Sequence, residues 1–185
     1  LRGAVDGWDF KNYVLGTMFY RYISENITNY INKGEEDAGV VGFNYEDLSD
    51  EDALTQRDDL IETKGFFILP SQLFSNVLKA SESDSATFID RDGNTRNTKD
   101  NLNELLEIVF DNIENSAKGS ESESNFAGLF DDFDVNSNKL GATVLKRNES
   151  LRKLLNGVAN MRLGDVKDHD IDAFGDAYEY LMTMY

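Results

Sequence analysis

Aspartate and asparagine alternate between Asp132 and Asn138, the spacing with which a common type of calcium-binding loop begins. Such a loop also needs glycine at its sixth position and a bidentate glutamate at its twelfth. Counted from Asp132, these positions hold Ser137 and Thr143. We therefore interpret the stretch as turns in which Asp and Asn side chains accept hydrogen bonds from nearby backbone N–H groups.

The chain has one histidine, His169, and no cysteine. His169 lies among scattered aspartates, which define neither a metal site nor an acid–base pair. There is no glycine-rich phosphate loop, no nucleophile elbow and no His-Glu-x-x-His motif. The sequence therefore predicts a solvated loop around His169. It also predicts that this segment holds no catalytic, cofactor-binding or metal-binding residue.

Basic residues cluster in one part of an otherwise acidic chain. The net charge is −17, but six lysines and arginines accompany a single glutamate between residues 139 and 162. Two interpretations remain open, a solvated helix face or a surface that meets a polyanion or a partner protein. The candidate DNA- or partner-facing residues are Lys146, Arg147, Arg152, Lys153 and Arg162.

Acidic residues dominate residues 35–62, where eleven carboxylates accompany Arg57 and no lysine. This stretch is either a solvated surface or one that meets a basic partner subunit. The overall charge argues against a free-standing nucleic-acid-binding protein, because the phosphate backbone attracts basic surfaces.

The hydrophobic spacing predicts a mainly α fold, an irregular multi-helix bundle around a central N-terminal helix. That helix covers residues 8–25 and its pattern ends at residues 32–34. Its apolar positions form two adjacent rows, which make a stripe wider than a coiled-coil seam, so we expect several helices to bury it. The rows are Phe10, Val14, Met18 and Tyr22, and Leu15, Phe19, Ile23 and Ile27.

Capping signals and a single proline divide the middle of the chain. Ser49 begins a capping box for a helix that ends at Gly65. Phe66 and Phe67 are expected to fill the core in an extended step before Pro70, which opens the next helix. A polar loop follows, whose turn signals allow one small hairpin near residues 86–97.

The second half of the chain carries the clearest helical pattern. Thr98 is predicted to cap a helix whose core face is Leu102, Leu105, Leu106, Val109, Phe110 and Ile113. Residues 116–124 are interpreted as flexible and low in complexity, and residues 126–133 as a short helical face. Asn148 is predicted to cap a helix with Leu151, Leu154, Leu155 and Val158 on its apolar face, and a last helix is expected at residues 171–185.

The length of 185 residues is sufficient for a single helical domain that spans the chain. No apolar run is long enough to cross a bilayer and no signal peptide is visible, so we expect a cytoplasmic protein without a membrane partner. The chain begins with Leu1 instead of methionine and ends at Tyr185 on an apolar helix face. Both ends suggest a piece of a longer protein.

Four blocks of sequence carry a resemblance when they are taken together. They are residues 1–22, residues 65–74, residues 126–132 with Leu140-Gly141, and residues 175–181. Their distinctive positions are Trp8, Phe10, Phe19, Pro70, Phe126, Phe130 and Tyr178. In this order the blocks resemble the N-terminal helical domain of the modification (M) subunit of type I restriction–modification systems, the HsdM family.

This resemblance implies that the full-length subunit is an S-adenosylmethionine-dependent DNA methyltransferase that modifies adenine N6. It implies partners as well: a specificity (S) subunit, a second M subunit, a restriction (R) subunit, and duplex DNA through the assembled complex. The helical domain would help this complex to assemble and to close around DNA. The family's glycine-rich cofactor motif and Asn-Pro-Pro-aromatic motif are absent, so the catalytic domain is expected after Tyr185.

A second interpretation belongs to another class. The chain would be a stand-alone acidic helical protein that mimics DNA and inhibits a DNA-binding enzyme. The net charge of −17 supports this interpretation. The basic stretch at residues 139–162 opposes it, because a mimic needs carboxylates spread along its surface like phosphates.

Overall fold

The structure is a computed structural model that describes residues 7–161, with side chains from residue 11 onward. Several sequence predictions therefore cannot be compared with it. Those that lie outside the described side chains concern Trp8, Phe10, Arg162, His169, Tyr178 and the helix expected at residues 171–185.

The described part of the chain is mainly helical, which confirms the predicted fold class. The α-helices are α1 (Gly7–Asp37), α2 (Asp50–Leu54), α3 (Arg57–Lys64), α4 (Phe74–Glu82), α5 (Leu102–Ser116), α6 (Glu123–Phe126) and α7 (Val144–Ala159). Short 3-10 turns occupy Tyr45–Asp47, Pro70–Gln72 and Lys99–Asn101. The predicted hairpin is also present, as β1 (Thr87–Ile89) paired antiparallel with β2 (Thr95–Asn97).

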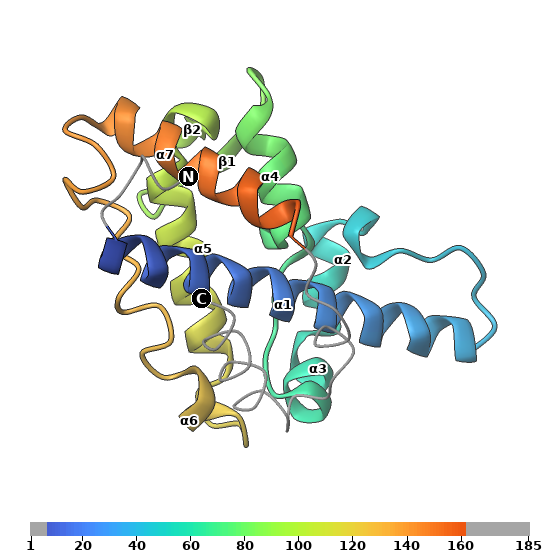
Figure 1. The fold of residues 1–185 in the computed structure, drawn as a ribbon. Coiled ribbons are helices and arrows are strands. Elements are labelled where there is room, and N and C mark those ends of the chain that lie inside the picture. The colour runs from blue at the N-terminus through green and yellow to red at the C-terminus, as the bar shows by residue number, and fades with distance from the viewer. Residues whose placement is uncertain (1–6, 162–185) are drawn as a thin grey trace.

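The first helix forms the centre of the bundle, as predicted. Helix α1 crosses the middle of the molecule in Figure 1, and α4 and α7 both pack against it. Helix α7 also packs against α5, so these four helices enclose one core. The α1 side chains in that core include Val14, Met18, Phe19, Ile23 and Ile27, all of them fully buried.

The end of α1 differs from the prediction. The helix runs through Gly34 and stops at Asp37, where the N–H of Val40 donates to the carbonyl of Glu35 at 2.9 Å and that of Gly39 to Glu36 at 2.9 Å. This pair of bonds is a Schellman motif, which requires a left-handed residue, and Gly39 has φ +90°. Gly39 is therefore the stop signal, and the last turns of α1 project beyond the apolar rows.

Asn148 caps a different helix from the predicted one. Thr143 caps α7, because its side chain accepts from the N–H of Lys146. Asn148 is buried inside α7, where its Oδ1 accepts from the N–H of Asn103 at 2.8 Å and its Nδ2 donates to the carbonyl of Asp100 at 2.7 Å. Its side chain therefore satisfies the first turn of α5 from outside, where the Thr98 side chain makes no capping bond.

The extended step before Pro70 fills the core as predicted, with Phe66 and Phe67 both buried. The segment at 116–124 is packed against this step, in contrast to the predicted flexibility. The N–H of Phe67 donates to Ser116 Oγ at 3.0 Å, and Ser120 Oγ donates to the carbonyl of Gly65 at 2.9 Å. Small hydroxyl side chains hold the two segments together because they reach backbone groups that no strand partner satisfies.

Two smaller predictions also need correction. The predicted helix from Ser49 to Gly65 is divided into α2 and α3, although Ser49 caps its start as expected, with its side chain accepting from Asp52 N. The aromatic segment at 126–133 is helical only to Phe126, yet Phe126, Phe130 and Phe133 are all buried. These rings are buried because they pack against other aromatic side chains and not because they share a helix face. Phe130, for example, stacks on Phe110 with ring centroids 4.1 Å apart.

Candidate functional site

The structure separates the basic candidates on α7. Lys146 and Lys153 are seven residues apart and therefore project from the same face of the helix, where both are exposed. Arg152 is half-buried and projects about 100° around the helix from Lys153. Lys146 Nζ lies 3.7 Å from Glu149 Oε2, and this exposed pair contributes little energy.

Arg147 points in another direction. Its Nη1 donates to the carbonyl of Gly141 at 3.1 Å and lies 3.4 Å from Asn138 Oδ1, and its Nε is buried without a partner. Arg147 therefore anchors the loop before α7 and is not available as a surface cation. Gly141 allows this close approach, since a Cβ there would lie 2.5 Å from Lys146 Cβ and 2.8 Å from the N atom of Arg147.

Arg21 is an internal arginine that sequence reasoning did not single out. Its Nη1 donates to the carbonyls of Val158 at 2.7 Å and Met161 at 2.5 Å, and its Nε lies 2.9 Å from Glu25 Oε1. A cation at this position satisfies the last carbonyls of α7 and interacts favourably with the helix dipole. The last turn of α7 has no basic residue of its own, so Arg21 on α1 fixes that end of the basic helix.

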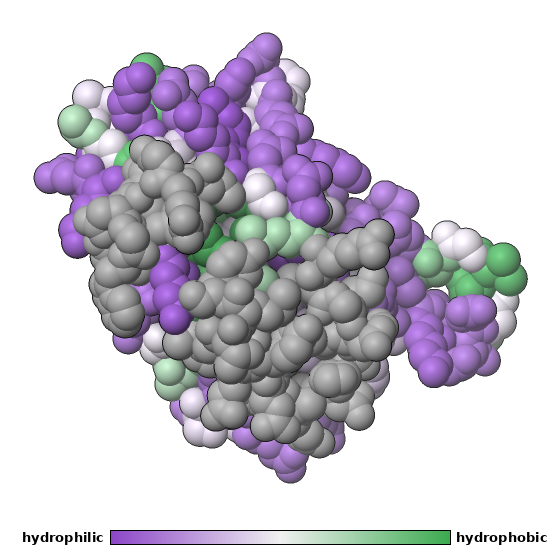
Figure 2. All heavy atoms as spheres, viewed as in Figure 1, coloured by the Kyte–Doolittle hydropathy of each residue, from purple (hydrophilic) through white to green (hydrophobic). Residues whose placement is uncertain are grey.

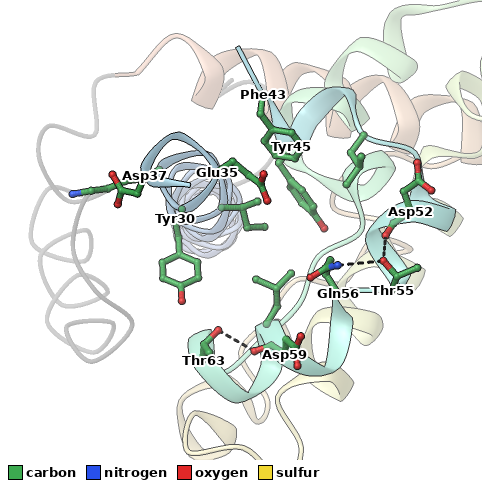
Figure 3. Close-up of a pocket in the computed structure, with 15 residues that line it drawn as sticks. Tyr30, Glu35, Asp37, Phe43, Tyr45, Asp52, Thr55, Gln56, Asp59 and Thr63 are labelled. Atoms are coloured by element: carbon green, nitrogen blue, oxygen red, sulfur yellow. Dashed lines mark hydrogen bonds between the residues drawn. The ribbon is translucent and has the colours of Figure 1, made fainter. Parts of the chain in front are cut away.

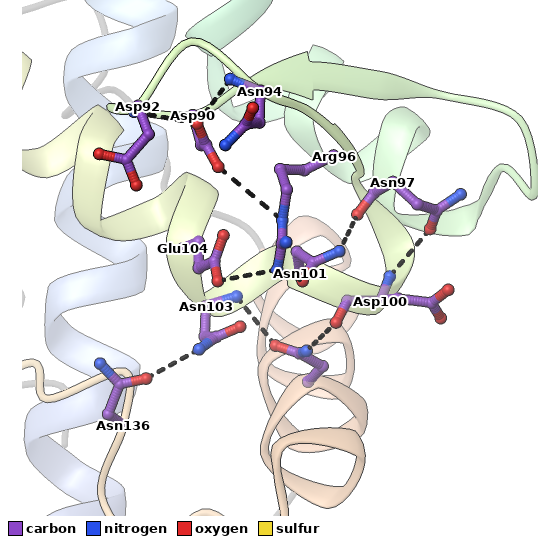
Figure 4. Close-up of polar contacts among 11 residues, drawn as sticks. Asp90, Asp92, Asn94, Arg96, Asn97, Asp100, Asn101, Asn103, Glu104 and Asn136 are labelled. Atoms are coloured by element: carbon purple, nitrogen blue, oxygen red, sulfur yellow. Dashed lines mark hydrogen bonds and ion pairs between the residues drawn. The ribbon is translucent and has the colours of Figure 1, made fainter.

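An asparagine-rich network joins the start of α5 to the N-terminal half of α7 (Figure 4). Arg96 on β2 donates through Nη2 to Asn101 Oδ1 at 2.7 Å and lies 3.1 Å from Glu104 Oε1. Asn103 Nδ2 donates to Asn136 Oδ1 at 2.8 Å. Together with Asn148, these bonds join the hairpin, α5, α7 and the loop at residue 136. The basic face of α7 is thus held on a rigid support.

A second feature is an open groove of about 770 Å³ between the end of α1 and the α2–α3 pair (Figure 3). Its apolar lining comes from Tyr30, Ile31, Phe43, Tyr45, Leu48 and Leu60. Glu35, Asp37, Asp52 and Asp59 add carboxylates, while Lys33 is the one cation among the described lining residues. The acidic stretch of the sequence is therefore combined with apolar surface, which the charge pattern alone did not indicate.

Among the described residues, two tyrosines with shifted pKa values have structural roles. Burial raises the pKa of the Tyr20 phenol well above its usual range. The pKa of the Tyr45 phenol is also raised, by burial first and by the nearby Asp50 carboxylate second. The hydroxyl of Tyr20 donates to the carbonyl of Gln72 at 2.5 Å and that of Tyr45 to the carbonyl of Ile68 at 2.7 Å. Both phenols therefore stay protonated and join α1 and the 3-10 turns to the Pro70 step.

The aspartate-rich turns bond to their own backbone, as interpreted from the sequence. Asp134 Oδ1 accepts from the N–H of Asn136 at 2.9 Å, and Asp90 Oδ1 accepts from Asp92 and Asn94. Within residues 11–161 no group of three His, Cys, Asp or Glu side chains is arranged to hold a metal ion. No described helix is long and apolar enough to span a membrane.

Comparison with known proteins identifies the family. The family described as the HsdM N-terminal domain matches residues 1–158, which is most of the chain. The chain therefore belongs to the HsdM N-terminal domain family, and the resemblance drawn from the sequence is confirmed.

Two relatives are similar over the whole chain. The type I restriction enzyme MpnII methylase subunit of Mycoplasma pneumoniae is 44% identical over 191 aligned positions, covering 100% of this chain and 32% of the relative. A crystal structure of the type I restriction–modification system methyltransferase subunit from Streptococcus thermophilus has a TM-score of 0.62 and 25% identity. It covers 99% of this chain and 35% of that chain. The chain thus spans about one third of the length of each relative.

Proposed function

We propose that this chain is the N-terminal assembly and DNA-facing domain of a type I restriction–modification methyltransferase subunit. The full-length subunit would transfer a methyl group from S-adenosylmethionine to adenine N6 in duplex DNA. Its partners would be an S subunit, a second M subunit and an R subunit, in the cytoplasm. Support comes from family membership and from relatives named as methylase and methyltransferase subunits.

The observation that carries the DNA-facing role is the outward face of α7. Lys146 and Lys153 are exposed together on a helix that Arg21 holds near its C-terminal end and that Asn148 joins to α5, in a chain of net charge −17. Cations in such an arrangement neutralise phosphates and release counterions, and this release makes binding depend on salt. Arg152 lies beside them, whereas Arg147 bonds to the carbonyl of Gly141 in the loop before α7.

The described residues do not fit S-adenosylmethionine. Such nucleotide cofactors sit where a strand of a parallel sheet leads through a glycine-rich turn into a helix. Between residues 7 and 161 the strands are β1 and β2, which form only an isolated antiparallel hairpin. We therefore propose that the cofactor site lies in the remainder of the subunit.

A salt titration of DNA binding tests the DNA-facing role. We would use the full-length subunit with its S subunit and compare Lys146→Glu/Lys153→Glu with the matched control Lys79→Glu/Lys118→Glu, which reverses two exposed lysines elsewhere. The α7 variant should bind duplex DNA more weakly and lower the salt slope by about 2, because each phosphate contact contributes roughly 0.9. Equal slopes for the two variants would contradict the proposal.

The DNA-mimic interpretation receives no support from these comparisons. A mimic needs carboxylates spaced like phosphates over a surface, whereas several carboxylates here line an apolar groove. We therefore retain the methyltransferase subunit as the proposed function.

A further inference from the structure

The groove between α1 and the α2–α3 pair combines three properties that rarely occur together on a solvated surface. It is large, at about 770 Å³, it has an apolar lining, and its lining includes four carboxylates. In Figure 3 Tyr30 and Glu35 project from α1 on one side, and Asp59 and Thr63 belong to α3 on the other. The walls are therefore helices whose side chains, and not their backbone groups, face an occupant.

Exposed apolar side chains gather at the same end of the molecule. Tyr30 is 42% exposed, Val40 is 44% exposed and Val41 is 94% exposed. Val40 and Val41 belong to the loop between Asp37 and Phe43, both of which line the groove. Figure 2 shows hydrophobic surface at the tip of this projecting arm. Exposed apolar surface with a polar rim is characteristic of an interaction site.

The charges decide what kind of partner would fit. Residues 35–62, which form the last turn of α1, the loop, α2 and most of α3, hold eleven carboxylates and one arginine. Lys64, which follows in α3, is 5% exposed, and its Nζ lies 5.0 Å from the ring centroid of Tyr30, so little of this cation is accessible to a partner. The surface around the groove is therefore strongly negative, and it attracts cationic partners and repels DNA.

We propose that this groove is a docking site for a basic amphipathic helix of a partner subunit. The apolar face of such a helix would lie on Tyr30, Phe43 and Leu60, and lysine or arginine side chains along its edges would reach Glu35 and Asp59. This is the helix-in-groove mode of recognition. The inference rests on the proposed assembly function and assigns that function to a site distinct from the basic face of α7.

The residues after 161 do not complement this groove in charge. Between residues 162 and 185 the sequence has six carboxylates and two basic side chains, Arg162 and Lys167. A like-charged segment disfavours docking on an acidic rim. The expected occupant therefore comes from another chain, and the binding measurement below includes the residues after 161.

The test uses the full-length subunit and a synthetic helical peptide with leucines along one face and lysines along its edges. Its control is a peptide of the same composition in shuffled order. Two protein variants carry the same change in net charge. Glu35→Lys/Asp59→Lys alters opposite walls of the groove, whereas Asp58→Lys/Glu62→Lys alters exposed positions of α3 outside its lining.

We expect wild type and Asp58→Lys/Glu62→Lys to bind the ordered peptide, and Glu35→Lys/Asp59→Lys to bind at least about tenfold more weakly. A peptide with glutamates in place of the lysines should reverse this order, which separates a change of surface charge from misfolding. Equal behaviour of the two double variants, or equal binding of ordered and shuffled peptides by wild type, would overturn the proposal. Neither DNA nor S-adenosylmethionine enters this measurement, so methyl transfer and groove binding succeed or fail separately.

Discussion

Replacement of Asn148 by alanine tests how α5 and α7 are joined. The substitution removes the acceptor for the N–H of Asn103 and the donor for the carbonyl of Asp100, at a side chain that is 1% exposed. A buried polar group left without a partner costs about 1–3 kcal/mol, so the two together cost about 2–6 kcal/mol. The higher helix propensity of alanine returns roughly 0.5 kcal/mol.

Asn156→Ala is the matched control for this measurement. Asn156 lies on the same helix and gains the same helix propensity, but its side chain bonds only the carbonyl of Arg152, at 3.2 Å. Urea unfolding followed by circular dichroism gives the free energy of unfolding of both variants. We expect Asn148→Ala to be less stable than Asn156→Ala by at least about 2 kcal/mol. A difference below about 0.5 kcal/mol would refute the assignment of Asn148 as the cap of α5.

Three further predictions follow from named contacts. Arg21→Ala should lower the free energy of unfolding by about 2 kcal/mol, since it removes two charge-assisted bonds to the end of α7; a variant as stable as wild type in urea would contradict this role. Gly141→Ala should cost about 1–3 kcal/mol, because the new Cβ would lie 2.5 Å from another Cβ, and a thermal melt unchanged from wild type would rule out the close approach. Tyr45→Phe should reduce the loss of stability above about pH 10, where the unfolded phenol ionises and the folded one, with its raised pKa, does not. Urea titrations at several pH values measure this slope, and equal slopes for Tyr45→Phe and wild type would contradict it.

The parts of the fold that the sequence predicts are those that depend on a long regular pattern. The face of α5 and the rows of α1 repeat over several turns, so helical spacing alone identifies them, and Val109 and Phe19 are buried as expected. The hairpin and the Ser49 cap depend on local turn chemistry, which is also visible in the chain. The helical faces, the hairpin and the cap can all be predicted without knowledge of which distant segments pack together.

The predictions that the structure corrects depend on contacts between segments that are far apart in the sequence. Asn148 has the residue type of a cap, but the helix that it caps begins 46 residues earlier in the sequence, at Leu102, and only packing brings them together. The segment with Ser116 and Ser120 is predicted to be flexible because hydroxyl side chains are common in loops, yet the Pro70 step offers backbone groups that these two serines bond. Local composition carries no signal for either contact.

The candidate sites show the same division. Charge counting located the basic and acidic stretches but could not separate Arg147 from Lys146, because only the fold brings the Gly141 carbonyl and Asn138 Oδ1 within reach of Arg147. The groove had a weak signal in the sequence, since Val40, Val41 and Phe43 interrupt an acidic run. Its apolar lining also depends on Tyr30 and Leu60, which come from helices on opposite sides.

Methyl transfer by the full-length subunit, assembled with its S subunit, tests the proposed function most directly. Duplex DNA is incubated with S-adenosylmethionine that carries a labelled methyl group, and the DNA is then digested to nucleosides and separated. The account predicts label in N6-methyl-2′-deoxyadenosine, with Lys146→Glu/Lys153→Glu slower than Lys79→Glu/Lys118→Glu at subsaturating DNA. Label in another nucleoside, the absence of label in DNA, or equal rates for the two variants would contradict it.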